Sequence, residues 1–141
     1  MAGYSGTPLA KKLGIKPGSA IFAVAAPGHY DELLAPLPED VKRVRKIDDA
    51  DVAHFFVTAR ARLDKELRAA VPKMKQDAAI WISWPKKSSK VETDITEDTI
   101  REVALPLGLV DIKVCAVDEI WSGLKLVIRK QLRKPASRSR S

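Results

Sequence analysis

The sequence predicts a single three-layer α/β domain, in which a mainly parallel sheet of about six strands ends in a C-terminal antiparallel hairpin. Residues 20–26, 52–58 and 78–84 are apolar at both odd and even positions, which is typical of strands covered on both faces. Segments of helical period separate these strands, and that alternation favours parallel pairing through right-handed crossovers. The last two strands, 109–117 and 123–131, are joined by DEIWS, which is short enough only for an antiparallel pair.

The remaining elements follow from local sequence signals. An N-terminal arm over residues 1–19 contains a short helix, LAKKL, with Pro8 in its first turn and Gly14 after its end. VKRVRKI, residues 41–47, is a weaker strand whose charges suit the edge of the sheet. We also expect helices near 29–35, over 60–71 with an apolar stripe of Leu63, Leu67, Ala70 and Val71, and from Asp94 or Thr96 onwards.

Length and composition indicate an ordinary globular protein. The chain of 141 residues fits one domain, expected over 20–132, and 45% of its residues are hydrophobic. No stretch approaches the ~18 apolar residues of a membrane helix, and the N-terminus lacks the apolar core of a secretory signal. We therefore expect a cytoplasmic protein that does not enter a membrane. Cys115 is the single cysteine, which excludes an internal disulfide and suggests a buried apolar role.

The net charge of +7 is concentrated at the C-terminus. Residues 129–141 hold six cations and no acid, and removing them leaves +1 for residues 1–128. Residues 133–141 are expected to be a disordered basic tail. Such a tail adds salt-sensitive affinity for nucleic acid, but no aromatic residue is interleaved with its charges to stack on bases.

Two segments resemble a known superfamily. LGIKPGSAIFAVAAPG and DAAIWISWPK lie where Rossmann-like methyltransferases have their "ikpG-x-x-vLdlG" and "GG-x-l-x-is" segments, and the terminal hairpin is a further shared feature. The chain is thus similar to a methyltransferase domain from which one central β–α unit has been deleted. The resemblance implies a Rossmann-like, methyltransferase-like fold; as an analogy between folds it does not imply the activity.

Longer strings resemble one bacterial family across almost the whole chain. GYSGTPLAKKLGIKPG, HFFVTARARL, WISWPKKSS, TDITED and REVALPLGLVDIKVCAVDEIWSGLKLVIRK are similar to the uncharacterised family called domain of unknown function three-thousand-and-fifty-two. This resemblance implies no activity, cofactor or site.

The turn after the first strand lacks the features that bind an adenosyl cofactor. Methyltransferases of this fold end that strand with an acidic residue and a Gly-x-Gly turn, which presents free N–H groups. Here residues 24–29 read Val-Ala-Ala-Pro-Gly-His, with one glycine, no carboxylate and a proline that removes a donor. The sequence therefore predicts no cofactor. Asp48 or Asp49, after the second strand, stays open as a ribose-binding acid.

Other common chemistries lack their residues. The sequence contains no P-loop, and His29, His54 and the single cysteine do not make a zinc set, so no metal site is predicted. His54 lies in the middle of a strand, which favours a core histidine whose hydrogen bonds are satisfied.

Ligands of open α/β sheets bind outside the carboxyl ends of the strands. This rule gives ten candidate ligand-binding residues: Gly28, His29, Thr58, Arg60, Trp84, Lys86, Lys87, Asp118, Glu119 and Trp121. Trp84 offers a flat aromatic face, and Lys86 with Lys87 suits an anion such as a phosphate or carboxylate; the alternative is a tryptophan that caps the core beside solvated lysines. Asp118 and Glu119 are expected either to pair with these lysines or to form an ordinary polar turn.

Three functions stay open at this point. The leading hypothesis is a non-catalytic Rossmann-like module, whose carboxyl-end residues bind a small anionic ligand or a protein partner. The second is a methyltransferase-like transferase with a remodelled cofactor site. The third is weak nucleic-acid binding through the basic tail.

Overall fold

A computed structural model of the chain describes residues 8–133 and forms one six-stranded sheet between two layers of helices. The strand order is β2-β1-β3-β4-β6-β5, in which β2, β1, β3 and β4 run parallel and β6 runs antiparallel to both of its neighbours. The strands are β1 (Ala20–Val24), β2 (Lys42–Arg43), β3 (Val52–Phe56), β4 (Ala79–Pro85), β5 (Leu109–Ala116) and β6 (Trp121–Ile128). This arrangement confirms the predicted α/β fold class with its C-terminal antiparallel hairpin.

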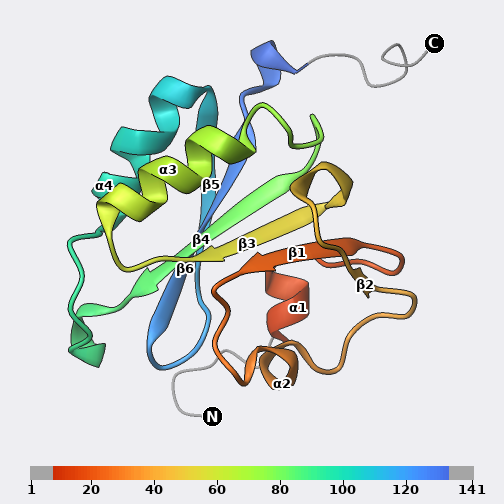
Figure 1. Cartoon of the computed structure of the whole chain (residues 1–141). Helices are drawn as coiled ribbons and strands as arrows, with labels where there is room; N and C mark the ends of the chain where they lie inside the picture. Colours follow the sequence, from red (N-terminus) through yellow and green to blue (C-terminus); the bar gives the residue numbers. More distant parts are fainter. Residues whose placement is uncertain (1–7, 134–141) are drawn as a thin grey trace.

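The helices cover the two faces of the sheet unequally. Figure 1 shows α1 (Leu9–Lys12) and α2 (Tyr30–Leu34) on one face, and α3 (Arg60–Ala70) and α4 (Glu97–Ala104) on the other. The stripe predicted for α3 faces the sheet, since Leu63 and Leu67 are fully buried. No helix within residues 8–133 is long and apolar enough to cross a membrane.

The expected edge strand over 41–47 is much shorter than the sequence suggested. Only Lys42 and Arg43 pair with β1, because the chain must then return over residues 44–51 to begin β3. This short return carries no α-helix, only the 3-10 turn Ile47–Asp49. Phe22, predicted to be covered on both faces of the sheet, is therefore only partly buried.

The start of α4 also differs from one of the two expected positions. Thr96 is the N-cap, and its hydroxyl and that of Thr99 each accept a backbone N–H of the other, in a reciprocal capping box. Asp94 does not cap this helix; its carboxylate accepts the N–H of Arg60 at 2.7 Å instead. The cap lies two residues later because Asp94 is used to hold the start of α3.

The predicted boundaries cannot all be compared with the structure. Residues 1–7 of the N-terminal arm, and residues 134–141 of the basic tail, lie outside the described residues.

Cys115 is half-buried. Burial raises the pKa of its thiol, although the positive charges of Lys12 and Lys113 act in the opposite direction.

Candidate functional site

Nine of the ten predicted residues lie on loops or strand ends at one edge of the sheet, where β1, β3 and β4 end and β6 begins, and Arg60 is the first residue of α3 at the same edge. We call this the carboxyl edge. The hairpin reaches it because antiparallel β6 starts there, with Trp121 paired to Pro85 at the end of β4. The N–H of Lys86 donates to the carbonyl of Ile120 at 2.7 Å, which extends this pairing past both strand ends. Two hollows formed by residues of the described part of the chain open on the carboxyl edge.

The first hollow lies between α2 and the hairpin. It has a volume of about 250 Å³ and is lined by His29, Leu33, Asp118, Glu119 and Ile120. His29 Nε2 lies 3.2 Å from Asp118 Oδ2, and the Asp118 side chain is only 8% exposed. The sequence left open a pairing of Asp118 with lysines; the structure pairs it with His29 instead.

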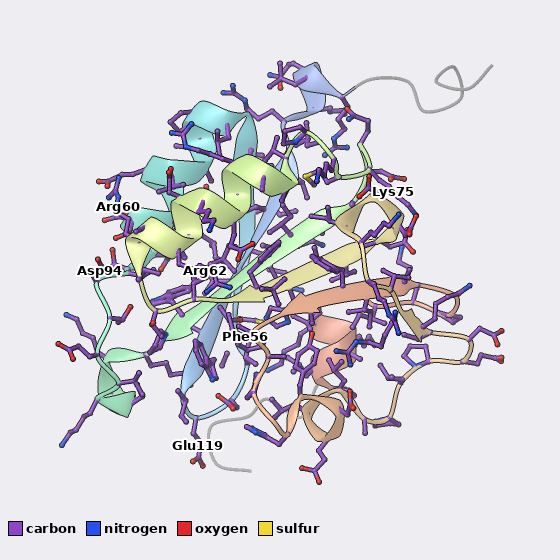
Figure 2. The ribbon with its side chains drawn as sticks, in the orientation of Figure 1. Phe56, Arg60, Arg62, Lys75, Asp94 and Glu119 are labelled. Atoms are coloured by element: carbon purple, nitrogen blue, oxygen red, sulfur yellow. The ribbon has the colours of Figure 1, made fainter. Side chains whose placement is uncertain are left out.

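Asp118 is held rigidly by the hairpin. Its Oδ1 accepts the backbone N–H groups of Ile120 and Trp121, both at 2.8 Å. Oδ2 is thereby directed at His29 Nε2, and Nδ1 of the same ring has no hydrogen-bond partner among residues 8–133. Glu119 belongs to the same turn but is exposed, and Figure 2 shows it projecting outward from the hairpin.

The turn after β1, residues 25–29, has an unusual backbone. Ala25 has a φ of +58°, in the left-handed region that residues with a Cβ avoid at a cost of roughly 1–2 kcal/mol. Within residues 8–133, the N–H groups of Ala26, Gly28 and His29 donate no hydrogen bond. A Cβ added at Gly28 would meet no atom within 4 Å, so the turn faces open space. We call residues 25–29 the β1 turn.

The second hollow lies under the loop that follows β4. It measures about 380 Å³, and its lining includes Trp84, Lys87, Thr93 and Ile95. Trp84 is 9% exposed and belongs to the apolar core under α3 and α4, which is the core-capping role weighed for it. Lys87 is exposed on the rim and forms no ion pair with a carboxylate in residues 8–133.

Thr58 and Arg60 belong to this second region, but both are already engaged. The carbonyl of Thr58 accepts the hydroxyl of Thr93 at 2.6 Å. The guanidinium of Arg60 donates to Glu102 at 2.7 Å, and Figure 2 shows Arg60 beside Asp94 at the start of α3. Arg60 therefore brings little free positive charge to a ligand.

A chain of buried polar side chains beneath the β1 turn was missed in the sequence. Tyr30 Oη lies 2.8 Å from His54 Nδ1, and His54 Nε2 lies 2.6 Å from Ser83 Oγ. Burial lowers the pKa of His54 to about 3 and raises that of the Tyr30 hydroxyl, so His54 is neutral and each of its nitrogens has a hydroxyl partner. The expected core histidine with satisfied hydrogen bonds is thus confirmed, and it anchors the residue that follows the β1 turn.

Aromatic packing links this chain to the hairpin. Phe56 stacks on His54 with ring centroids 4.3 Å apart, and Trp121 meets Phe56 edge-on at 5.1 Å. Figure 2 places Phe56 in the interior, between the helices and the hairpin. Trp121 therefore has a packing contact, while its partial exposure leaves one part of the ring at the carboxyl edge.

The acids suggested for ribose binding are at the opposite end of the sheet. Asp48 and Asp49 lie in the 3-10 turn just before β3 begins, and the next carboxylate, Asp51, accepts the N–H of Ala20 at the start of β1 at 2.8 Å. The hypothesis that Asp48 or Asp49 stands beside the β1 turn is therefore wrong. The short return after β2 explains the error, because it carries these residues to the amino ends of the strands.

Comparison with known proteins supports the fold. No family model matches the chain, so its resemblance to domain of unknown function three-thousand-and-fifty-two stays a prediction, and no curated protein matches. A putative type 11 methyltransferase from Sulfolobus solfataricus has a similar structure, with a TM-score of 0.63 and 12% identity over 90% of this chain and 93% of that one.

Two further solved structures give the same result. A SAM-dependent methyltransferase from Aquifex aeolicus aligns with a TM-score of 0.55 and 14% identity, over 85% of this chain and 87% of that chain. DhpI in complex with SAH aligns with a TM-score of 0.56 and 10% identity, over 84% and 81% of the two chains. The chain therefore has a methyltransferase-like Rossmann fold.

Proposed function

We propose that this protein is a methyltransferase-like transferase that binds an S-adenosylmethionine-type cofactor at the β1 turn through a remodelled site. The fold favours this function over the non-catalytic binding module, because solved proteins of the same fold include a SAM-dependent methyltransferase and an SAH complex. The observation that carries the proposal is the exposed β1 turn, where the N–H groups of Ala26, Gly28 and His29 donate to no acceptor in residues 8–133.

These amides fit one part of the cofactor. Backbone N–H groups without an acceptor in residues 8–133 suit the carboxylate of the amino-acid portion, and the open side of Gly28 leaves room for it. β2 ends on Arg43 rather than on an acid that could bind the ribose, and Arg43 pairs with Asp31 of α2 at 2.7 Å. The remodelled site thus depends on main-chain donors. It does not use the acidic residue and the Gly-x-Gly turn that follow the first strand in methyltransferases of this fold.

When bound, such a cofactor supplies an electrophilic methyl group. His29 is placed to take the proton that an acceptor hydroxyl or amine must lose, because Asp118 holds its Nε2 side and leaves Nδ1 free. The adjoining hollow, partly apolar through Leu33 and Ile120, is where that acceptor would lie. His29 and Asp118 are therefore the proposed acid–base pair.

Isothermal titration of the full chain with S-adenosylmethionine and S-adenosylhomocysteine tests the proposal. We expect micromolar binding, and Gly28→Leu should weaken it by about tenfold or more because the added side chain fills the space in front of the free amides. Ala61→Leu, an exposed position on α3, is the matched control and should bind like the natural protein.

Absence of binding by both compounds at about 1 mM, a concentration that detects even weak ligands, would refute the transferase proposal. The non-catalytic module would then be the better hypothesis. One specific observation favours it, namely the hollow that contains Trp84 and Lys87, a lysine without an ion-pair partner in residues 8–133. In that case adenosine monophosphate should bind the full chain, and Lys87→Met should weaken its binding.

A further inference from the structure

Lysines converge on the sheet face that α1 covers, at the end away from the carboxyl edge. Lys125 on β6 lies directly opposite Lys113 on β5 in the antiparallel ladder. Lys16, in the turn after α1, lines the same hollow as Lys125. Like charges directly opposite each other across two strands are destabilising. The register of the hairpin thus brings positive charges together at a cost to the fold.

None of these three lysines forms an ion pair with a carboxylate of residues 8–133. Among residues 8–133, Lys75 is the only lysine that forms an ion pair, and its partner is Asp51. Lys113 Nζ donates to the carbonyl of Lys12 at 3.4 Å, a dipole at the end of α1 rather than a counter-charge. Burial, together with repulsion from Lys113 and Lys16, lowers the pKa of Lys125.

A hollow of about 330 Å³ opens beside these groups. Its lining includes Lys16, Ser19 and Lys125, together with the carboxylates of Asp51 and Asp77. Asp51 is occupied, since its Oδ2 accepts the N–H of Ala20 at 2.8 Å and its Oδ1 faces Lys75 at 3.1 Å. The volume lies at the lower end of the range typical of small-molecule sites.

We propose that Lys16 and Lys125, with Lys113 adding to their field, bind the phosphate group of a small anionic molecule in this hollow. A dianion relieves the repulsion between the lysines, which a neutral or cationic ligand does not. The two carboxylates in the lining disfavour a nucleic-acid strand, because its long run of phosphates would extend past the lysines and meet them. The site is separate from the carboxyl edge and does not depend on the proposed transferase function.

Calorimetric titration of the full chain with inorganic pyrophosphate at fixed ionic strength tests this site. Lys125→Met keeps the aliphatic stem but removes the charge, so we expect it to weaken binding by about tenfold or more. Lys65→Met, an exposed position on α3, removes the same charge from the opposite face and should leave the affinity unchanged.

Thermal unfolding gives a second measurement, which distinguishes a lysine that binds the anion from a lysine that only supports the fold. Without anion, Lys125→Met should unfold at a higher temperature than the natural protein because one repulsive charge is gone. Pyrophosphate should raise the Tm of the natural protein and of Lys65→Met, but not that of Lys125→Met.

Three results would overturn the proposal. These are no binding of pyrophosphate at about 1 mM, an equal loss of affinity in Lys65→Met, and tighter binding of a single-stranded oligonucleotide than of pyrophosphate at the same salt concentration. The last result would assign the lysines to nucleic acid. Binding of S-adenosylhomocysteine should be unaffected by Lys125→Met, so failure here is distinguishable from failure of the transferase proposal.

Discussion

The two faces of the sheet are held to their helices in different ways, although alternate residues of the same strands form both. On β3, Ala53 and Phe55 face α3 and α4, while His54 and Phe56 face α1 and α2. The face under α3 and α4 is covered by the larger cluster of buried apolar side chains. The other face contains buried hydrogen bonds, including the bond from Trp81 Nε1 to the carbonyl of Leu13 at 3.0 Å.

The lengths of the helices explain this difference. α3 has eleven residues and α4 has eight, whereas α1 has four and α2 has five. Helices as short as α1 and α2 bury little apolar area and do not form stably by themselves. Hydrogen bonds from Tyr30 and to Leu13 therefore fix their positions on the sheet. The comparison teaches that hydrogen bonds replace buried apolar area in holding the helices to the sheet where those helices are short.

The largest expected effect tests the apolar face. Leu67→Ala in α3 should lower the free energy of unfolding by about 3–4 kcal/mol, because the side chain is fully buried between a long helix and the sheet. Leu34→Ala in α2 should cost less, about 2 kcal/mol, because a five-residue helix can relax into the space. Urea denaturation measures both values, and an equal loss in the two variants would contradict the comparison.

The next effect tests the hydrogen-bonded face. Tyr30→Phe removes one oxygen atom and leaves Nδ1 of fully buried His54 without a partner, so we expect a loss of about 2 kcal/mol in the free energy of unfolding. Ser83→Ala removes the partner of the other nitrogen and should cost a similar amount. If Tyr30→Phe unfolds at the same urea concentration as the natural protein, these hydrogen bonds do not hold α2 in place.

A pH series should separate the two faces further. The pKa of His54 is about 3 in the folded protein, below its ordinary value of 6.5, so the unfolded chain binds a proton between these values and the folded chain does not. His54 stabilises the fold least at low pH: its contribution falls as the pH drops below 6.5, by up to about 1.4 kcal/mol per pH unit. The stability difference between the natural protein and His54→Gln should therefore shrink on acidification. A difference that stays constant from about pH 7 to about pH 4.5, a range that crosses the ordinary pKa of 6.5, would show that His54 is not buried and neutral.

The smallest effect sharpens the description of the β1 turn, which leads into α2. Ala25→Gly should raise the free energy of unfolding by about 1 kcal/mol, since glycine adopts the left-handed conformation without the penalty of a Cβ. Ala26→Gly, at the neighbouring position without a positive φ, should lower it slightly. The reverse ranking of the two variants would mean that Ala25 is not strained in solution.

The sequence was informative wherever local patterns are strong. The runs around β3 and β4, the stripe of Leu63 and Leu67, and the short DEIWS connection predicted the layers and the hairpin correctly. It was less informative at β2, because the pattern of VKRVRKI does not show that residues 44–51 must turn back at once. The error over Asp48 and Asp49 has the same origin, since their place depends on where that crossover runs.

The sites depended more on tertiary structure. The rule that ligands bind at carboxyl ends identified the loops of the candidate site, but His29 and Asp118 are 89 positions apart and nothing local pairs them. His54 and Ser83 could each have been noticed in the sequence, because each is a polar residue among apolar neighbours in a buried strand. Their hydrogen bond follows only from the register of β3 against β4.

The sequence by itself determined the alternation of strands and helices, the antiparallel end of the sheet, and the low glycine content of the β1 turn. Those features follow from local periodicity, chain length and the conformational limits of single residues. Only the tertiary structure decided which amides of that turn are free, which acid orients His29, and which lysines stand opposite each other. Strand register and the closure of long loops set these contacts, and both depend on the energy of the whole packed chain rather than on any short segment of it.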